Sequence, residues 1–119
     1  MSLCILAGGK TAMVAASLFT LSWTHSVEKV EWRETWRVSP EGFAIVEARI
    51  KGSGAGMEPP PDARFEHGWW IYVPVLPPLP ELRLAASGAT PSAWTLCAAG
   101  TCRTLGAVSG TQVVLKPCP

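Results

Sequence analysis

Apolar and polar residues alternate in LFTLSWTH (residues 18–25) and again in VEWRETWRV (residues 30–38). Such period-two alternation is typical of strands that bury one face. The four residues between the two segments have the length of a hairpin connection. A slip of one residue would turn an apolar face to water, so the register is well defined. Matching the apolar faces predicts three cross-strand pairs: Trp23 with Trp32, Phe19 with Trp36, and Leu21 with Glu34.

The apolar start of the chain, Met1 to Trp23, has two interpretations. It carries no basic residue before Lys10, and Gly8-Gly9-Lys10 divides it into two pieces. We therefore predict two core strands around a Gly-Gly-Lys turn, and a degenerate or trimmed export signal is the alternative. The uninterrupted run from Thr11 to Leu21 is shorter than the roughly 20 residues that cross a bilayer, so no membrane span is predicted.

A third strand is predicted over residues 43–50, after a turn at Ser39-Pro40-Glu41-Gly42. Either of its faces could be buried. We predict that the wholly apolar set points inward, and the alternative turns Glu47 and Arg49 inward beside Glu34. The apolar set consists of Ala44, Val46, Ala48 and Ile50.

The rest of the chain predicts further short strands. Residues 52–68 show no periodicity and are predicted as a loop, and residues 74–80 form a Pro-rich extended connector. Shorter strands are expected at residues 69–73, 82–86, 93–97, 102–105 and 112–115. The pattern predicts one all-β domain over residues 1–119, an antiparallel β-sandwich or partly open barrel of about eight short strands.

Composition limits the class of partner. The chain has 119 residues, 48% hydrophobic and 16% charged, with a net charge of +1. A disordered chain has far more charge and fewer apolar residues. Nucleic acids and anionic membranes attract clustered Lys and Arg, whereas acidic and basic residues are interspersed here, so neither is predicted as a partner. No motif indicates a cofactor.

The four cysteines leave two alternatives open. Cys97 and Cys102 flank a four-residue hairpin loop, and Cys4 and Cys118 lie near opposite chain ends, which are often close in a compact domain. Two disulfides or four reduced thiols both fit. The spacings lack CxxC pairs and neither His is near a Cys in sequence, so no metal site is predicted.

Glu34 interrupts an aromatic strand face. A carboxylate in apolar surroundings is costly unless it is paired or hydrogen-bonded, so its pKa is expected to be shifted. Three residues are expected as partners: His25, Arg49 and Arg33. Glu34 is then either a structural group that fixes the register or a carboxylate that faces a ligand.

Other candidate binding residues lie in loops and on one later strand. The sequence HSVE at residues 25–28 suggests a hydrolase triad, but neighbouring strand residues point to opposite faces and no GxSxG elbow is present. The glycine-rich GSGAG at residues 52–56 matches no phosphate-binding motif. Trp69 and Trp70 are expected on opposite faces of a strand, one in the core and one exposed or covered by the long loop. The candidate binding set is His25, Ser26, Glu28, Glu34, Gly54, Gly56, Met57, Glu58 and Trp70, with no catalytic residue assigned.

These features together resemble a known family. HSVE at residues 25–28, Glu34 between Trp32 and Trp36, and GAGM at residues 54–57 with the prolines after it resemble the uncharacterised bacterial family DUF1850. Its members are small proteins often encoded beside TRAP solute transporters of the TAXI type. The resemblance covers roughly Phe19 to Pro61. It implies an extracytoplasmic accessory of a solute uptake system, and it implies no catalytic residue.

The resulting functional hypothesis is a non-enzymatic binding or accessory module. Its expected partners are transporter components or a small carboxylate solute. One alternative is a small acid–base enzyme that uses Glu34 or Glu28 with His25. Another is a structural domain that associates through its aromatic face. Periplasmic location follows from the resemblance and a cytoplasmic one is the alternative, while the oligomeric state is not indicated.

Overall fold

The computed structural model describes residues 1–24, 30–52, 60–84, 93–107 and 112–119. In this part of the chain eleven β-strands and no helix are found, so the fold is all-β as predicted, with more strands than the expected eight. The strands are β1 (Ser2–Ala7), β2 (Lys10–Val14), β3 (Leu18–Thr24), β4 (Glu31–Ser39), β5 (Gly42–Lys51), β6 (Arg64–Glu66), β7 (Trp69–Tyr72), β8 (Leu82–Leu84), β9 (Trp94–Ala98), β10 (Thr101–Leu105) and β11 (Val113–Cys118).

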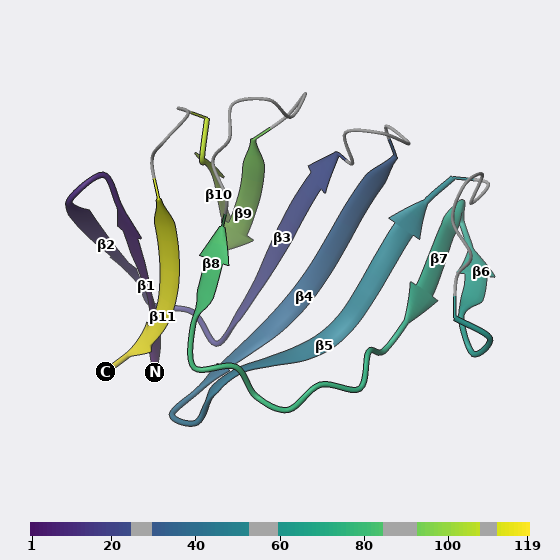
Figure 1. Ribbon diagram of the computed structural model, residues 1–119, viewed down its shortest axis with the longest axis horizontal. Helices are drawn as coiled ribbons and strands as arrows, with labels where there is room; N and C mark the ends of the chain where they lie inside the picture. The colour runs from purple at the N-terminus through teal and green to yellow at the C-terminus, as the bar shows by residue number, and fades with distance from the viewer. Residues whose placement is uncertain (25–29, 53–59, 85–92, 108–111) are drawn as a thin grey trace.

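Two antiparallel sheets contain these strands. The small sheet has the order β2-β1-β11-β8, and the large sheet has the order β10-β9-β3-β4-β5-β7-β6. In Figure 1 the small sheet lies toward the β10–β9–β3 end of the large sheet, and β7 and β6 lie at the opposite end. The two sheets do not close into a barrel, which agrees with the predicted sandwich or partly open barrel.

The hydrophobic core combines side chains from both sheets. Its buried members are Leu3, Ile5, Phe19, Leu21, Trp36, Val38, Phe43, Leu84, Leu96, Ala98, Val113 and Leu115. We call the face of the large sheet that bears Phe19 and Leu21 the inner face, and its opposite the outer face. Burial of these apolar side chains is the main force that holds the two sheets together.

The hairpin of β3 and β4 has the predicted register. Trp23 pairs with Trp32, Leu21 with Glu34 and Phe19 with Trp36. At the start of the chain, β1 and β2 join through Gly8 and Gly9, whose φ values of 56° and 78° suit glycine. Two strands around this turn are therefore present as predicted, but only β1 is a core strand, because β2 lies at the edge of the small sheet and has no buried residue.

The third predicted strand, β5, uses both of its possible faces. Thr35 pairs with Glu47 but Trp36 pairs with Ile45, so the register shifts at a β-bulge in which Val46 has no partner residue on β4. Ala48 and Ile50 point to the inner face after the bulge, as predicted. Before it, Phe43 and Ile45 point inward instead of Ala44, so the prediction was wrong for that half.

The stretch predicted as a loop over residues 52–68 contains part of a hairpin. Arg64–Glu66 forms β6, which pairs with β7. His67 and Gly68 connect them with φ values of 51° and 86°, the two positive values that a tight two-residue hairpin turn needs. Three residues are too few to show a period, so the sequence did not reveal this strand.

A connector without strands leads from β7 to β8. Its residue Leu79 pairs with Phe43 at the start of β5, with N···O distances of 2.7 and 2.9 Å. Gly42, at φ 127°, lies directly against the Leu79 carbonyl. A glycine there allows a backbone approach that a side chain would prevent.

Both cysteine pairs are disulfides, Cys4–Cys118 and Cys97–Cys102. Their Cα atoms lie 5.9 and 4.0 Å apart. Of the two alternatives that the sequence left open, the structure shows the oxidised one.

Candidate functional site

A row of aromatic side chains crosses the inner face of the large sheet at the end away from the turn between β4 and β5. Register places Trp23 beside Trp32, Trp32 beside Ile50, Ile50 beside Trp70, and Trp70 beside Phe65. Trp94 continues the row on β9 through its contact with Trp23. We call these residues, Trp94, Trp23, Trp32, Ile50, Trp70 and Phe65, the aromatic row.

Ring contacts hold the aromatic row together. The Trp23 and Trp32 rings stack with centroids 6.0 Å apart and planes 17° apart. Trp94 tilts against Trp23 at 4.7 Å, and Phe65 meets Trp70 edge-on at 4.9 Å. Such aromatic pairs stabilise a fold by about 0.5–1.5 kcal/mol beyond their buried area. The row is therefore a packed surface of rings rather than a set of loose side chains.

Beside the aromatic row lies a second row with two ionisable groups. Glu34 on β4 pairs with Ala48 on β5, and Ala48 pairs with Tyr72 on β7. A carboxyl and a phenol thus flank the methyl group of a buried alanine on one sheet face. We call Glu34, Ala48 and Tyr72 the Glu34–Tyr72 site.

The Glu34 carboxyl is held by an indole. Trp36 Nε1 donates a hydrogen bond to Glu34 Oε1 at 3.1 Å. Burial raises the pKa of Glu34 above its ordinary value of 4.5, and the Trp36 hydrogen bond opposes this effect only in part. Because these are residues 34 and 36 of one strand, they share a face, and the contact could have been predicted from the spacing.

Two of the predicted partners of Glu34 are elsewhere. Arg33 and Arg49 project from the outer face, where Arg33 pairs with Glu31 and Arg49 with Glu47. The prediction that either arginine meets Glu34 was wrong, because strand alternation sends neighbouring residues to opposite faces. The third predicted partner, His25, lies outside the described residues.

The polar groups around Glu34 are hydrogen-bond donors. Burial raises the pKa of Tyr72 first, and the nearby Glu34 charge raises it further, so the phenol keeps its proton. Trp70 lies two residues before Tyr72 on the same face, and its buried Nε1 has no hydrogen-bond partner in the described part of the chain. A buried N–H without an acceptor costs free energy, which a ligand with an acceptor atom would recover.

Trp69 and Trp70 lie on opposite faces, as the alternation predicted, and both are half-buried. Trp70 belongs to the aromatic row. Trp69 lies on the outer face with the Arg33 guanidinium 4.9 Å and the Lys51 ammonium 5.4 Å from its ring centroid. These cation–π contacts tie the outer ladder of ion pairs to β7.

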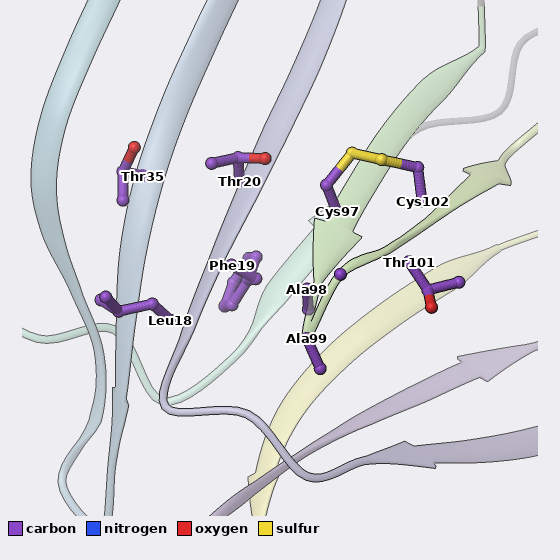
Figure 2. Close-up of a pocket in the computed structure, with 10 residues that line it drawn as sticks. Leu18, Phe19, Thr20, Thr35, Cys97, Ala98, Ala99, Thr101 and Cys102 are labelled. Carbon is purple, nitrogen blue, oxygen red and sulfur yellow. A yellow bond between two sulfur atoms is a disulfide. The ribbon is translucent and has the colours of Figure 1, made fainter.

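A groove opens on the outer face at the turn between β9 and β10 (Figure 2). Its volume is about 460 Å³. The lining includes Leu18 and Thr20 of β3, Thr35 of β4 and the Cys97–Cys102 disulfide. All of its lining residues are uncharged. This groove is on the opposite side of the large sheet from the Glu34–Tyr72 site.

Several candidate residues cannot be placed. His25, Ser26, Glu28, Gly54, Gly56, Met57 and Glu58 lie outside the described residues. Among the residues that are described, no cluster of three His, Cys, Asp or Glu side chains could hold a metal ion. No helix in the same part of the chain is long and apolar enough to span a membrane.

Sequence reasoning missed Tyr72, Trp94 and Phe65, and Phe65 was missed because its strand was predicted as a loop. Tyr72 meets Glu34 only through the pairing of β5 with β7, and these strands are separated by residues without periodicity. Trp94 reaches Trp23 because β9 pairs with β3, far away in the chain. The sequence did contain one indication: Trp70 and Tyr72 are two residues apart on one strand, so their side chains are expected on the same face.

Comparison with known proteins identifies the family. The profile described as "Domain of unknown function (DUF1850)" matches residues 19–105, which include both the aromatic row and the Glu34–Tyr72 site. No curated protein and no solved structure gives a significant match to the chain. Because the match covers well over half of its length, the chain belongs to the DUF1850 family.

Proposed function

We propose that the protein is a non-enzymatic binding module that recognises a small carboxylate solute at the Glu34–Tyr72 site, as an accessory of a TRAP solute uptake system of the TAXI type. One observation carries this proposal. The Glu34 carboxyl is half-buried among aromatic side chains, and it accepts a hydrogen bond from the Trp36 indole rather than from a cation. Ionisable groups with shifted pKa values gather at functional sites more often than elsewhere.

The donors around Glu34 suit a carboxylate. A raised pKa favours the neutral acid, whose O–H can donate to a ligand oxygen. Tyr72 adds a phenolic O–H. The aromatic row supplies apolar contact for the rest of the solute. Binding of a carboxylate would therefore be coupled to protonation of Glu34.

The link to solute uptake rests on the family. From the resemblance described above, we expect members of this family to be encoded beside TAXI-type transporters, and an accessory of that system would meet the solute that it carries. A direct test mixes the purified chain with the purified solute-binding component of such a transporter and measures association by calorimetry. Absence of association with and without solute would remove the transporter part of the proposal.

Solute binding is tested by thermal shift and calorimetry over a panel of carboxylates, their amides and matched amines. We expect carboxylates to stabilise the chain more at pH 5 than at pH 8, because ionised Glu34 loses its donor and repels the ligand. Amines would show the opposite pH dependence if Glu34 acted as an anionic receptor, and that result would overturn the choice of a carboxylate.

Variants locate the binding site. Glu34→Gln keeps a side-chain donor at every pH, so its carboxylate affinity should lose the pH dependence. Tyr72→Phe removes one donor and should weaken binding by about tenfold, the value of one hydrogen bond. Glu47→Gln is the matched control, since Glu47 is a half-buried glutamate on the outer face of β5. Equal binding by all three variants would contradict the assignment.

A further inference from the structure

The Cys97–Cys102 disulfide is open to the outside. It joins directly opposite residues of β9 and β10 on the outer face, and Cys102 is exposed. Figure 2 shows it beside the groove of about 460 Å³, with the Thr20 hydroxyl directed toward Cys97. A thiolate can attack a disulfide only where a sulfur is accessible, and exposed disulfides are the labile or regulatory ones.

The second disulfide differs in surroundings. Cys4–Cys118 joins β1 and β11, the two central strands of the small sheet, and Cys4 is 9% exposed while Cys118 is half-buried. β1 and β11 contribute four fully or nearly fully buried residues to the core: Leu3, Ile5, Val113 and Leu115. The structure thus contains a less exposed disulfide between β1 and β11 and a more exposed disulfide in the β9–β10 hairpin.

We propose that Cys97–Cys102 is a redox-active disulfide, which a dithiol reductant opens and which a disulfide oxidant closes again by the reverse exchange, while the chain stays folded. This role goes beyond solute binding and uses the other face of the large sheet. The Cys4–Cys118 disulfide remains oxidised throughout and has a structural role.

The exchange proceeds in two steps. A thiolate of the dithiol attacks Sγ of Cys102, the sulfur–sulfur bond breaks, and the Cys97 thiolate leaves while a mixed disulfide forms. The second thiolate of the dithiol then attacks the dithiol sulfur that is bonded to Cys102 in the mixed disulfide, and the Cys102 thiolate leaves. Two electrons pass to the chain, the two protons of the dithiol end on Cys97 and Cys102, and the dithiol becomes a disulfide.

The fold does not depend on this bond. β9 and β10 are held by a ladder of five residue pairs, and β9 is also paired with β3. Leu96 and Ala98 of β9 are buried in the core, where they keep the strand in place. An open hairpin bond would therefore leave Cys97 and Cys102 opposite each other, ready to be oxidised again.

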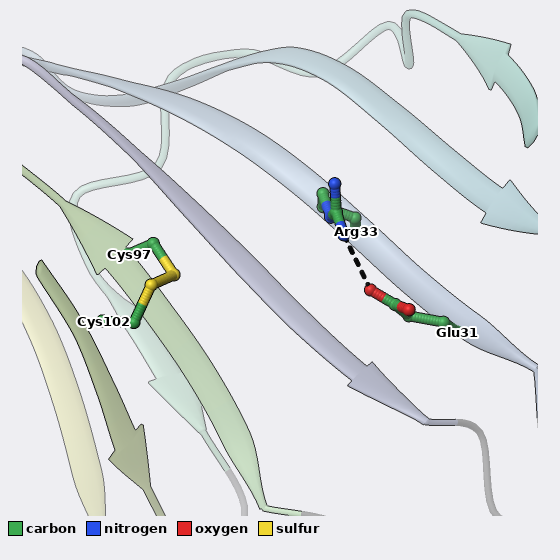
Figure 3. The surroundings of a disulfide bond; sticks show 4 residues. All are labelled: Glu31, Arg33, Cys97 and Cys102. Atoms are coloured by element: carbon green, nitrogen blue, oxygen red, sulfur yellow. Dashed lines mark hydrogen bonds and ion pairs between the residues drawn. A yellow bond between two sulfur atoms is a disulfide. The ribbon is translucent and has the colours of Figure 1, made fainter. Parts of the chain in front are cut away.

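The surroundings do not repel an incoming thiolate. The cross-strand row that contains the disulfide continues with Thr20 and Thr35, and the groove lining carries no charge. Figure 3 shows β3 between the disulfide and the Arg33–Glu31 ion pair, whose atoms are 3.0 Å apart. Arg33 is engaged with Glu31 and is separated from the disulfide by β3.

Differential alkylation of the full chain tests the proposal. The native protein is treated with graded concentrations of dithiothreitol, trapped with iodoacetamide and mapped by peptide mass. We expect Cys97 and Cys102 to be labelled at least about tenfold faster than Cys4 and Cys118, because access controls the exchange rate. The near-UV circular dichroism should stay constant, and oxidised dithiothreitol should restore the disulfide.

Three outcomes would overturn the proposal: equal labelling rates, earlier labelling of Cys4 and Cys118, or a loss of the near-UV signal in step with labelling of Cys97. The Cys97→Ser/Cys102→Ser double variant is the control. It should take up no label under conditions that reduce the accessible bond, and it should keep the near-UV spectrum of the native chain. A changed spectrum would assign the bond a structural role instead.

Discussion

The strands of the large sheet differ between their two ends: the inner face packs against the small sheet at the end near the turn between β4 and β5, and it carries the aromatic row at the other end. At the end covered by the small sheet, the inner face carries Phe19, Leu21 and Phe43, each 2% exposed or less. At the other end, the inner face carries the aromatic row, together with Glu34 and Tyr72. Ala48 and Ile50 are buried at this second end, yet they lie outside the core cluster.

The difference shows how one strand serves two environments. Along β3 the inner face changes from Phe19 and Leu21 to Trp23, and along β4 it changes from Trp36 to Glu34 and Trp32. Phe and Leu suit a face that another sheet covers completely. Trp and Tyr combine apolar area with a polar atom, so they suit a face that is covered in part and that meets a polar ligand. The covered end therefore contains most of the buried core, and the other end is the one at which we propose that a ligand binds.

The largest expected effect concerns the small sheet, on which the covered end depends. Loss of Cys4–Cys118 by double substitution to serine should lower the free energy of unfolding by about 4–5 kcal/mol, because the bond closes a loop of more than 100 residues. Loss of Cys97–Cys102 should cost about 2 kcal/mol, since its loop is short. Urea unfolding without reductant measures both, and equal losses would contradict the distinction between the two bonds.

Two phenylalanines compare the ends directly. Phe19→Ala should destabilise the chain by about 3–5 kcal/mol, because Phe19 is 1% exposed between the sheets. Phe65→Ala should cost only about 1 kcal/mol, since Phe65 is 53% exposed and loses mainly its contact with Trp70. Urea unfolding of both variants measures the difference. A loss at Phe65 as large as that at Phe19 would mean that the aromatic row belongs to the main core.

Two glycines make the same comparison for the backbone. Gly42→Ala should cost about 2–3 kcal/mol, because its Cβ would collide with the Leu79 carbonyl and its φ of 127° is unfavourable. Gly68→Ala should cost about 1 kcal/mol, since φ is 86° but the surrounding space is open. Thermal unfolding ranks the two variants. A reversed order would mean that the connector yields more easily than the β6–β7 hairpin.

The sequence contained the register of the central hairpin because its alternation is long and regular. Seventeen residues in two segments determine which faces match, and a slip would expose an indole ring. The alternation failed at β5, where a bulge lets both faces contribute to the core. A bulge adds one residue without changing composition, so periodicity alone does not locate it.

The candidate site was predictable only in part. Glu34 stood out because a carboxyl in an aromatic face is costly, and the structure places it there with a raised pKa. Tyr72 could not be assigned to it, because the pairing of β7 with β5 joins segments that are distant in the chain. Long-range pairing of this kind depends on the whole core rather than on local pattern.

The smallest expected effect compares two glutamates by pH. Because burial raises the folded-state pKa of Glu34 above 4.5, the folded chain binds this proton more tightly than the unfolded chain does. Ionisation of Glu34 therefore destabilises the fold. This loss of stability grows as the pH rises from about 4.5 through the raised pKa, and it is constant at higher pH.

The Glu34→Gln variant has no carboxyl to ionise. The difference in free energy of unfolding between this variant and the native chain should therefore increase, in favour of the variant, as the pH rises through the same range. Glu47→Gln, on the outer face beside Arg49, should show no such increase. Urea unfolding at a series of pH values measures both differences, and a flat difference for Glu34→Gln would mean that the carboxyl is hydrated and that the uncovered end of the sheet holds no ligand-facing acid.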